Sequence, residues 1–127
     1  MTQAERAQRG RRAEKAVAWR LWWHGYRILE RNFATPGGEV DIIARKGDTV
    51  AFVEVRAREE GAAIAPKDTV TYAKERRIDA AASAYLKATR LRDVTVRYDI
   101  AEVWLNGRGK PKRIEIIEAA FGDPRYR

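Results

Sequence analysis

Two carboxylates lie inside apolar runs of the sequence, where a charged side chain is costly. Asp41 interrupts the run VDIIA, and Glu54 interrupts the run AFVEV. A charge that has apolar residues before and after it in the chain is typical of a central strand, which is buried on both faces. A carboxylate buried there needs a partner, which can be an arginine, a protonated carboxyl group or a metal ion. The alternative is that both carboxylates lie at strand ends and pair with surface arginines, of which this basic chain has many.

The spacing between these carboxylates predicts that they face each other. A tight turn at residues 46–48 (KGD) joins two strands over residues 39–45 and 49–58, which should pair as an antiparallel hairpin. In the simplest register Asp41 lies opposite Glu54. Two carboxylates at this separation repel each other unless a cation lies between them. Magnesium binds through one or two carboxylates together with substrate phosphates, so the pattern predicts a hydrolytic metal site.

Hydrophobic periodicity predicts two helices and five strands around this site. Residues 8–24 and 69–88 have apolar side chains at helical spacing. Strands are predicted over residues 26–33, 39–45, 49–58, 94–105 and 113–120, with turns at 34–38, 46–48 and 106–109 and a polar loop at 59–68. A helix between the third and fourth strands implies a parallel strand pair. The expected fold is a single α/β domain over residues 1–127, with its core at about 10–120 and a mixed sheet of four or five strands flanked by helices.

Composition narrows the classes of protein that this chain can be. Its 127 residues include 26 Lys and Arg against 18 Asp and Glu, which gives a net charge of +8, and no cysteine. Disulfides, thiolate metal sites and thiol nucleophiles are therefore excluded. No apolar run approaches the roughly 20 residues that span a bilayer, and residues 1–16 do not resemble a secretory signal. We expect a cytoplasmic protein that binds a polyanion, with nucleic acid as the first candidate and an anionic membrane as the second.

Aromatic and basic side chains on the two predicted helices have two interpretations each. Trp22 and Trp23 can stack on bases, but a helical position beside apolar neighbours favours the core for Trp23. Lys74, Arg76 and Arg77 crowd the start of the second helix, where positive charge is unfavourable. They either hold phosphates or form a solvated face.

Other polar groups indicate structural roles. Arg97 and Asp99 are two residues apart on a strand and should pair. His24 is the only histidine, so neither a histidine-dependent triad nor a zinc site of several histidines has support. It precedes Gly25 at the predicted end of the first helix and should interact with that end. Glu39 either is an outer ligand of the predicted metal site or simply follows a turn, and the turn is favoured.

Five blocks of sequence together resemble a known superfamily. They are GRRAEKA (residues 10–16), GEVDII (38–43), FVEVR (52–56), KERRI (74–78) and RYD (97–99). The combination resembles the restriction-endonuclease-like superfamily, whose signature is Asp, a gap, then Asp or Glu, any residue and Lys. Within that superfamily the chain is similar to the small bacterial YraN-like proteins, over about residues 10–119.

The resemblance implies a fold, an activity and a set of site residues. The fold is that of type II restriction enzymes and archaeal Holliday-junction resolvases. The activity is Mg²⁺- or Mn²⁺-dependent hydrolysis of phosphodiester bonds in DNA or structured nucleic acid, with no role for a membrane. Asp41 and Glu54 would be metal ligands, and Glu14 would reach in from the first helix. Independently of the resemblance, the basic charge of the two helices makes Arg11, Arg12, Lys15, Lys74 and Arg77 the candidates to bind nucleic acid. Many nucleases of this fold act as homodimers, because cutting two strands needs two sites.

The chain departs from the superfamily signature at its third position, where Arg56 replaces lysine. Lysine can lose a proton when buried, whereas arginine stays protonated and acts as an electrostatic clamp. Arg56 can still stabilise the transition state, and Lys74 is a candidate catalytic replacement for the missing lysine. Arginine here equally suits a module that binds nucleic acid without cutting it. A third hypothesis, a positive surface that binds an acidic protein, rests on charge alone.

Overall fold

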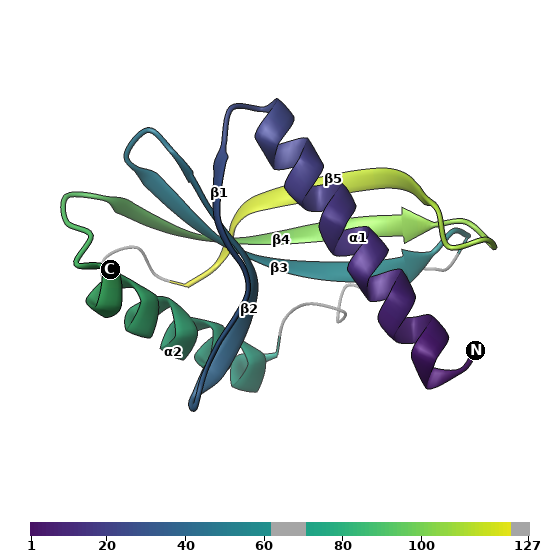
Figure 1. Ribbon diagram of the computed structural model, residues 1–127, viewed down its shortest axis with the longest axis horizontal. Helices are drawn as coiled ribbons and strands as arrows, with labels where there is room; N and C mark the ends of the chain where they lie inside the picture. Colours follow the sequence, from purple (N-terminus) through teal and green to yellow (C-terminus); the bar gives the residue numbers. More distant parts are fainter. Residues whose placement is uncertain (62–70, 123–127) are drawn as a thin grey trace.

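The computed structural model describes residues 1–61 and 71–122, which form one mixed sheet and two helices (Figure 1). The elements are α1 (Gln3–Trp23), β1 (Arg27–Thr35), β2 (Gly38–Lys46), β3 (Thr49–Glu59), α2 (Tyr72–Thr89), β4 (Thr95–Leu105) and β5 (Pro111–Phe121). The strands lie in chain order, β1-β2-β3-β4-β5. Only β3 and β4 pair in parallel, and the other three pairs are antiparallel. The predicted five-stranded α/β fold is confirmed, and the parallel pair lies where the α2 crossover requires it.

The ends of the elements differ from the prediction mainly at the helices. Helix α1 begins at Gln3 instead of residue 8, because Thr2 and Glu5 form a capping box that satisfies the first turn. Helix α2 begins at Tyr72, with Thr71 as its N-cap, whereas the predicted start at residue 69 lies outside the described residues. Most of the predicted loop at 59–68 also lies outside them, and its first residue instead ends β3 at Glu59. No helix in the described part of the chain is long and apolar enough to cross a bilayer.

The two helices cover opposite faces of the sheet, because successive strand residues point to opposite sides. On β3, Ala51 and Val53 pack with α1, while Val50 and Phe52 pack with α2. The buried helical residues are Ala13, Val17 and Leu21 from α1, and Ile78, Ala81, Ala82 and Tyr85 from α2. In Figure 1, α1 crosses β3 and β4 diagonally, and α2 lies beside β2. The carboxylates of the hairpin therefore lie between two helical layers.

The expectation that Trp23 belongs to the core is wrong. Its side chain is 68% exposed. The buried face of α1 is set by Val17 and Leu21, and Trp23 follows Leu21 by two residues, which is a rotation of about 200° around the helix. The apolar residues of the segment predicted the helix correctly. The prediction that the Trp23 indole lies on the buried face of that helix was wrong.

Helix α2 packs on β2 through a glycine. A Cβ atom built on Gly38 would lie 1.8 Å from the carbonyl oxygen of Arg77 and 2.6 Å from its carbonyl carbon. The sequence predicted Gly38 as part of a turn, but it is the first residue of β2. The absence of a side chain lets the backbone of α2 touch the strand that carries Asp41, which fixes α2 relative to the hairpin.

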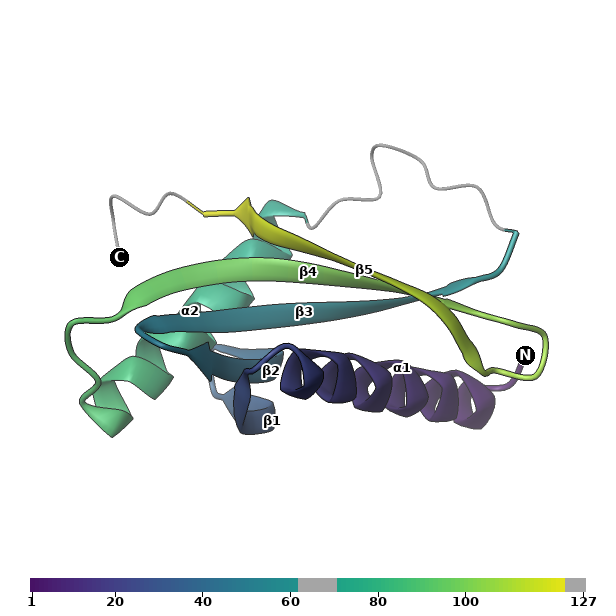
Figure 2. The ribbon, with the colours of Figure 1, turned by 90° about the horizontal axis from the view of Figure 1, so that it is seen from above.

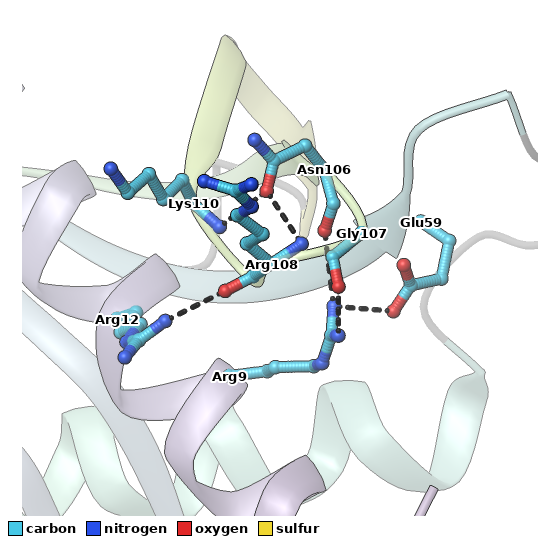
Figure 3. Close-up of polar contacts among 7 residues, drawn as sticks. All are labelled: Arg9, Arg12, Glu59, Asn106, Gly107, Arg108 and Lys110. Atoms are coloured by element: carbon cyan, nitrogen blue, oxygen red, sulfur yellow. Dashed lines mark hydrogen bonds and ion pairs between the residues drawn. The ribbon is translucent and has the colours of Figure 1, made fainter.

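The first half of α1 is bound to the turn between β4 and β5 (Figure 3). The Arg9 guanidinium donates to the carbonyl oxygens of Asn106 and Gly107, at 3.3 and 3.1 Å, and Arg12 donates to that of Arg108 at 3.0 Å. The Asn106 side chain accepts from the backbone N–H groups of Arg108 and Lys110, which holds the turn closed. Figure 2 shows this turn beside the N-terminal half of α1.

Candidate active site at the end of the β2–β3 hairpin

The paired part of the β2–β3 hairpin ends at Ile42, which directly follows Asp41 in the sequence. The last pair is Ile42 with Val53, and the same register would next place Asp41 opposite Glu54, as the sequence predicted. Instead of a strand-to-strand bond, the Oδ2 atom of Asp41 accepts a hydrogen bond from the backbone N–H of Val55, at 2.7 Å. The Asp41 carboxylate therefore lies against β3, beside the residue that follows Glu54.

The negative charge of Glu54 acts on the Asp41 carboxyl group. Burial raises the pKa of the Asp41 carboxyl group to about 7, and the charge of Glu54 adds to this effect. Glu14 raises it further, whereas the Val55 hydrogen bond and the charge of Lys74 lower it. A positive charge beside Asp41 would favour its ionised form. The structure thus brings the two predicted carboxylates together in a setting that favours a cation.

Lys74 reaches this pair from the first turn of α2. Its Nζ atom lies 3.0 Å from Oε1 of Glu54, whose side chain is 6% exposed, and the Lys74 side chain is half exposed. Thr71 caps the helix by accepting a hydrogen bond from the Lys74 N–H. The crowding of basic residues at the start of α2 is thus partly explained, because Glu54 offsets Lys74 and Glu39 lies 3.4 Å from Arg77.

Arg56 shares the face of β3 with Glu54 but is directed to a different carboxylate. Its Nη1 atom lies 3.9 Å from Oε1 of Glu102 on β4. Arg58, two residues further along, binds the same carboxylate through a 2.5 Å contact between Nε and Oε2. Glu102 is 6% exposed, so both guanidinium groups contact a buried carboxylate. The sequence analysis predicted no contact between Glu102 and either arginine, and it did not predict Arg58 as a site residue.

These side chains line a pocket of about 340 Å³ at the N-terminus of α2. Its walls are Glu54, Val55, Arg56, Ala57, Arg58, Thr71 and Lys74. Three cationic side chains and a helix N-terminus meet there, which is the chemistry that recognises phosphate groups. Glu54, one of the two carboxylates of the hairpin, also lines this pocket. The pocket can therefore hold an anionic ester next to an acidic pair.

Glu14 lies close to this site but is held by β1. Its Oε1 atom accepts hydrogen bonds from Asn32 Nδ2 at 2.8 Å and from Arg31 Nη2 at 3.3 Å. Asn32 has a φ of 54°, a left-handed conformation that asparagine tolerates better than most residues. Over residues 1–61 and 71–122, no three acidic, histidine or cysteine side chains are arranged to hold a metal ion. Asp41 and Glu54 are thus a pair, and the role of Glu14 as a third ligand stays a prediction.

The residues predicted to bind nucleic acid fall into two groups. Lys74 lies at the pocket, and Arg77 is exposed one turn further along α2. Arg11, Arg12 and Lys15 are exposed on α1 and do not line the pocket. If both groups contact one ligand, that ligand extends well beyond the carboxylates.

The predicted pairing of Arg97 with Asp99 is confirmed, and it is structural. Asp99 is fully buried and accepts hydrogen bonds from the Arg97 guanidinium and from the Ala119 backbone N–H. Arg97 also donates to the Tyr26 hydroxyl at 2.7 Å. This network ties β4 to β5 and to the segment after α1, away from the carboxylate pair.

Sequence reasoning missed the groups that support the site. Arg31, Asn32 and Glu102 contact predicted site residues, and none was predicted. Glu102 could have been found, because it lies inside the apolar run DIAEVWL, the same signal that identified Asp41. Arg31 and Asn32 lie on a strand with mostly exposed side chains, where no periodicity distinguishes them.

Comparison of the sequence with known proteins identifies relatives of this chain. A model of the uncharacterised protein family UPF0102 matches residues 13–103, which is most of the chain. The chain belongs to the UPF0102 family. UPF0102 proteins of Moorella thermoacetica and Desulfosudis oleivorans are 38% and 40% identical to it, over 91% and 92% of this chain and 97% and 92% of their own. A UPF0102 protein of Anaeromyxobacter dehalogenans is 42% identical over 91% of this chain and 86% of its own.

The family match confirms the YraN-like resemblance seen in the sequence. The matched span runs from α1 into β4 and includes the three candidate carboxylates, Arg56 and Lys74. Strand β5 lies outside it. The elements that form the candidate site are therefore the elements by which the UPF0102 family is matched.

Proposed function

We propose that this UPF0102 protein is a Mg²⁺- or Mn²⁺-dependent nuclease that hydrolyses phosphodiester bonds in DNA or structured nucleic acid. The observation that carries the proposal is the position of the Asp41 carboxylate on the Val55 N–H, beside Glu54, with Lys74 bound to Glu54 at the N-terminus of α2. The net charge of +8 favours a polyanionic substrate. The mixed sheet with one helix on each face is compatible with the restriction-endonuclease-like resemblance.

The donor set of this pair suits a hard divalent cation. Asp41 and Glu54 provide carboxylate oxygens, and their mutual repulsion is relieved by positive charge. Magnesium commonly binds through one or two protein carboxylates and takes its other ligands from water and phosphate. When bound, such an ion would polarise a phosphoryl oxygen and make water more acidic.

The chain's own cations would hold and orient the phosphate. Arg56 and Arg58 are fixed by Glu102, so their guanidinium groups are preorganised before an anion arrives. Lys74 is more exposed and adds charge at the acidic pair. Because an arginine stays protonated, Arg56 would neutralise developing negative charge without exchanging a proton.

The deciding experiment is cleavage of end-labelled duplex, flap, junction and single-stranded DNA with Mg²⁺ or Mn²⁺. Glu54→Gln removes the buried carboxylate charge and is expected to abolish cutting. Glu39→Gln is the matched control, because Glu39 is an exposed carboxylate on the neighbouring strand. Cutting by the parent that needs the metal and is lost only in Glu54→Gln supports the proposal. Cutting by Glu54→Gln at the parental rate contradicts it.

A second candidate function is nucleic-acid binding without hydrolysis. It is favoured by Arg56, whose guanidinium lies near Glu102 and stands where the superfamily signature has lysine. On this hypothesis the parent binds DNA and leaves it intact. Arg56→Lys tests it directly, because a nuclease fold that lost only this lysine should regain metal-dependent cutting. If the parent itself cuts, the binding-only function is wrong.

A further inference from the structure

An exposed aromatic stack on α1 is not used by the proposed site. The rings of Trp19 and Trp22 lie 5.3 Å apart at an interplanar angle of 19°, and their side chains are 62% and 55% exposed. They line a shallow groove of about 790 Å³ together with Ile28 and Arg31 of β1 and Pro111 of β5. Large exposed apolar patches generally mark interaction sites. The two indoles are therefore an unassigned surface with flat rings available to a ligand.

The charge around the stack limits what can occupy the groove. Arg12, Lys15 and Arg31 line it. Helix α1 as a whole carries six basic residues (Arg6, Arg9, Arg11, Arg12, Lys15 and Arg20) against Glu5 and Glu14. A second copy of this face would bring the same positive charge and be repelled. The occupant must combine negative charge with flat apolar surfaces.

Single-stranded nucleic acid has this combination. Its phosphates are anionic, and its unpaired bases stack on aromatic side chains in a way that depends little on sequence. A duplex hides the faces of its bases, so it could use the basic residues but not the indoles. An anionic membrane has no flat rings to match two parallel indoles in a hollow that β1 and β5 border.

Arg31 connects this groove to the candidate site. It lines the groove and also donates to Glu14, whose charge acts on Asp41. We propose that the Trp19–Trp22 groove binds the unpaired bases of a nucleic-acid strand, with Arg12, Lys15 and Arg31 on its phosphates. The binding stands by itself, while the further statement that this strand is the one presented for cleavage rests on the proposed function. The substrate class would then be single-stranded or branched nucleic acid instead of continuous duplex.

The test is fluorescence anisotropy with a labelled oligothymidylate and a blunt hairpin duplex, in EDTA so that no cleavage occurs. Replacing both indoles (Trp19→Ala with Trp22→Ala) should weaken oligothymidylate binding about tenfold or more, the loss of about one stacked base. The double Trp→Phe variant should stay close to the parent, since phenylalanine also stacks. Duplex binding should change little in either variant. Trp23→Ala is the control, because Trp23 is also exposed on α1 and does not line the groove; its ring is tilted by 47° against that of Trp22 and so does not extend the stack.

Three results would overturn the proposal. One is unchanged oligothymidylate affinity in the double alanine variant. Another is binding to phosphatidylglycerol vesicles that depends on the two indoles while oligonucleotide binding does not. The third is a parental dimer, seen by sedimentation, that the alanine variant dissociates without loss of oligonucleotide affinity. Binding is measured in EDTA on variants of the groove, whereas the cleavage assay depends on the metal and on Glu54, so failure of the nuclease proposal and failure of the groove proposal give different results.

Discussion

Lys74 Nζ lies 3.0 Å from Glu54 Oε1, which joins the first turn of α2 to the middle of β3. The two ends of this contact differ in solvation, since Glu54 is buried and Lys74 is half exposed. The crossover helix is therefore attached to the sheet by an ion pair at the point where the two coupled carboxylates meet. The Lys74 ammonium group offsets the negative charge of the buried Glu54 carboxylate at this point.

Removing Lys74 should leave a buried carboxylate without its counter-charge. We expect Lys74→Gln to lower the free energy of unfolding at pH 7 by about 1 kcal/mol, a small value because the lysine is solvent-screened. The double variant Lys74→Gln with Glu54→Gln should recover most of that loss. Urea unfolding of the parent, both single variants and the double variant measures the coupling. Additive effects would show that the contact contributes nothing.

The pH dependence of stability should follow from Asp41. Its pKa is raised to about 7 in the folded protein from an ordinary value of 3.8, so the folded state binds the proton more tightly than the unfolded state. Stability should therefore fall as the pH rises from about 4 to about 7 and then level off, by about 4 kcal/mol as an upper limit. Asp41→Asn should remove this fall. Urea unfolding in EDTA at pH 5, 7 and 9 measures it.

The control for the pH series is Asp48→Asn in the β2–β3 turn, where the side chain is 86% exposed. This variant should keep the slope of the parent. A parental stability that rises over the same interval would contradict the assignment of the slope to Asp41.

A methyl group on Gly38 should push α2 away from β2. The clash is with the backbone of Arg77, which no side-chain rotation can relieve. We expect Gly38→Ala to destabilise the fold by about 2–4 kcal/mol. Gly10→Ala in α1 is the matched control, because nothing lies within 4 Å of its added Cβ. That control should be neutral or slightly stabilising. Equal melting temperatures for the two variants would show that α2 can shift freely.

Nucleic-acid affinity should depend steeply on salt. Each phosphate contact releases counterions, which contributes about −0.9 to the slope of log K against log salt concentration on duplex DNA. Replacing Arg11 and Lys15 with Gln should reduce the magnitude of that slope by about 1–2. Lys87→Gln with Arg92→Gln makes the same change in net charge in the last turn of α2 and just beyond its C-terminus, and should alter the slope less. A flat salt profile for the parent would exclude backbone binding.

The hairpin and its acidic pair could be predicted from the sequence because the signals are local. The KGD turn sets the register, and the continuous apolar runs around Asp41 and Glu54 leave these two carboxylates as the exceptions within one buried hairpin. Lys74 was harder, since it reaches the pair only through the crossover from β3 to α2. It was predicted because a lysine was missing at position 56.

The supporting groups could not be predicted because they depend on long-range packing. Asn32 lies 18 residues after Glu14 in sequence, and Glu102 lies 44 residues after Arg58. The exposure of Trp23 depended on the exact rotation of α1 over the sheet, which a run of apolar residues near a helix end does not define. The groove formed by Trp19 and Trp22 escaped prediction for the same reason.

The binding of α1 to the β4–β5 turn has a consequence for synthesis of the chain. Arg9 bonds to groups 97 and 98 residues later in the sequence, so α1 leaves the ribosome long before its partner exists. Until then the apolar side of α1, which carries Ala13, Val17 and Leu21, has no sheet to cover it. Contacts this distant in sequence also slow folding, because a long loop must close first. The nascent helix therefore presents an uncovered apolar face to chaperones and to misassembly.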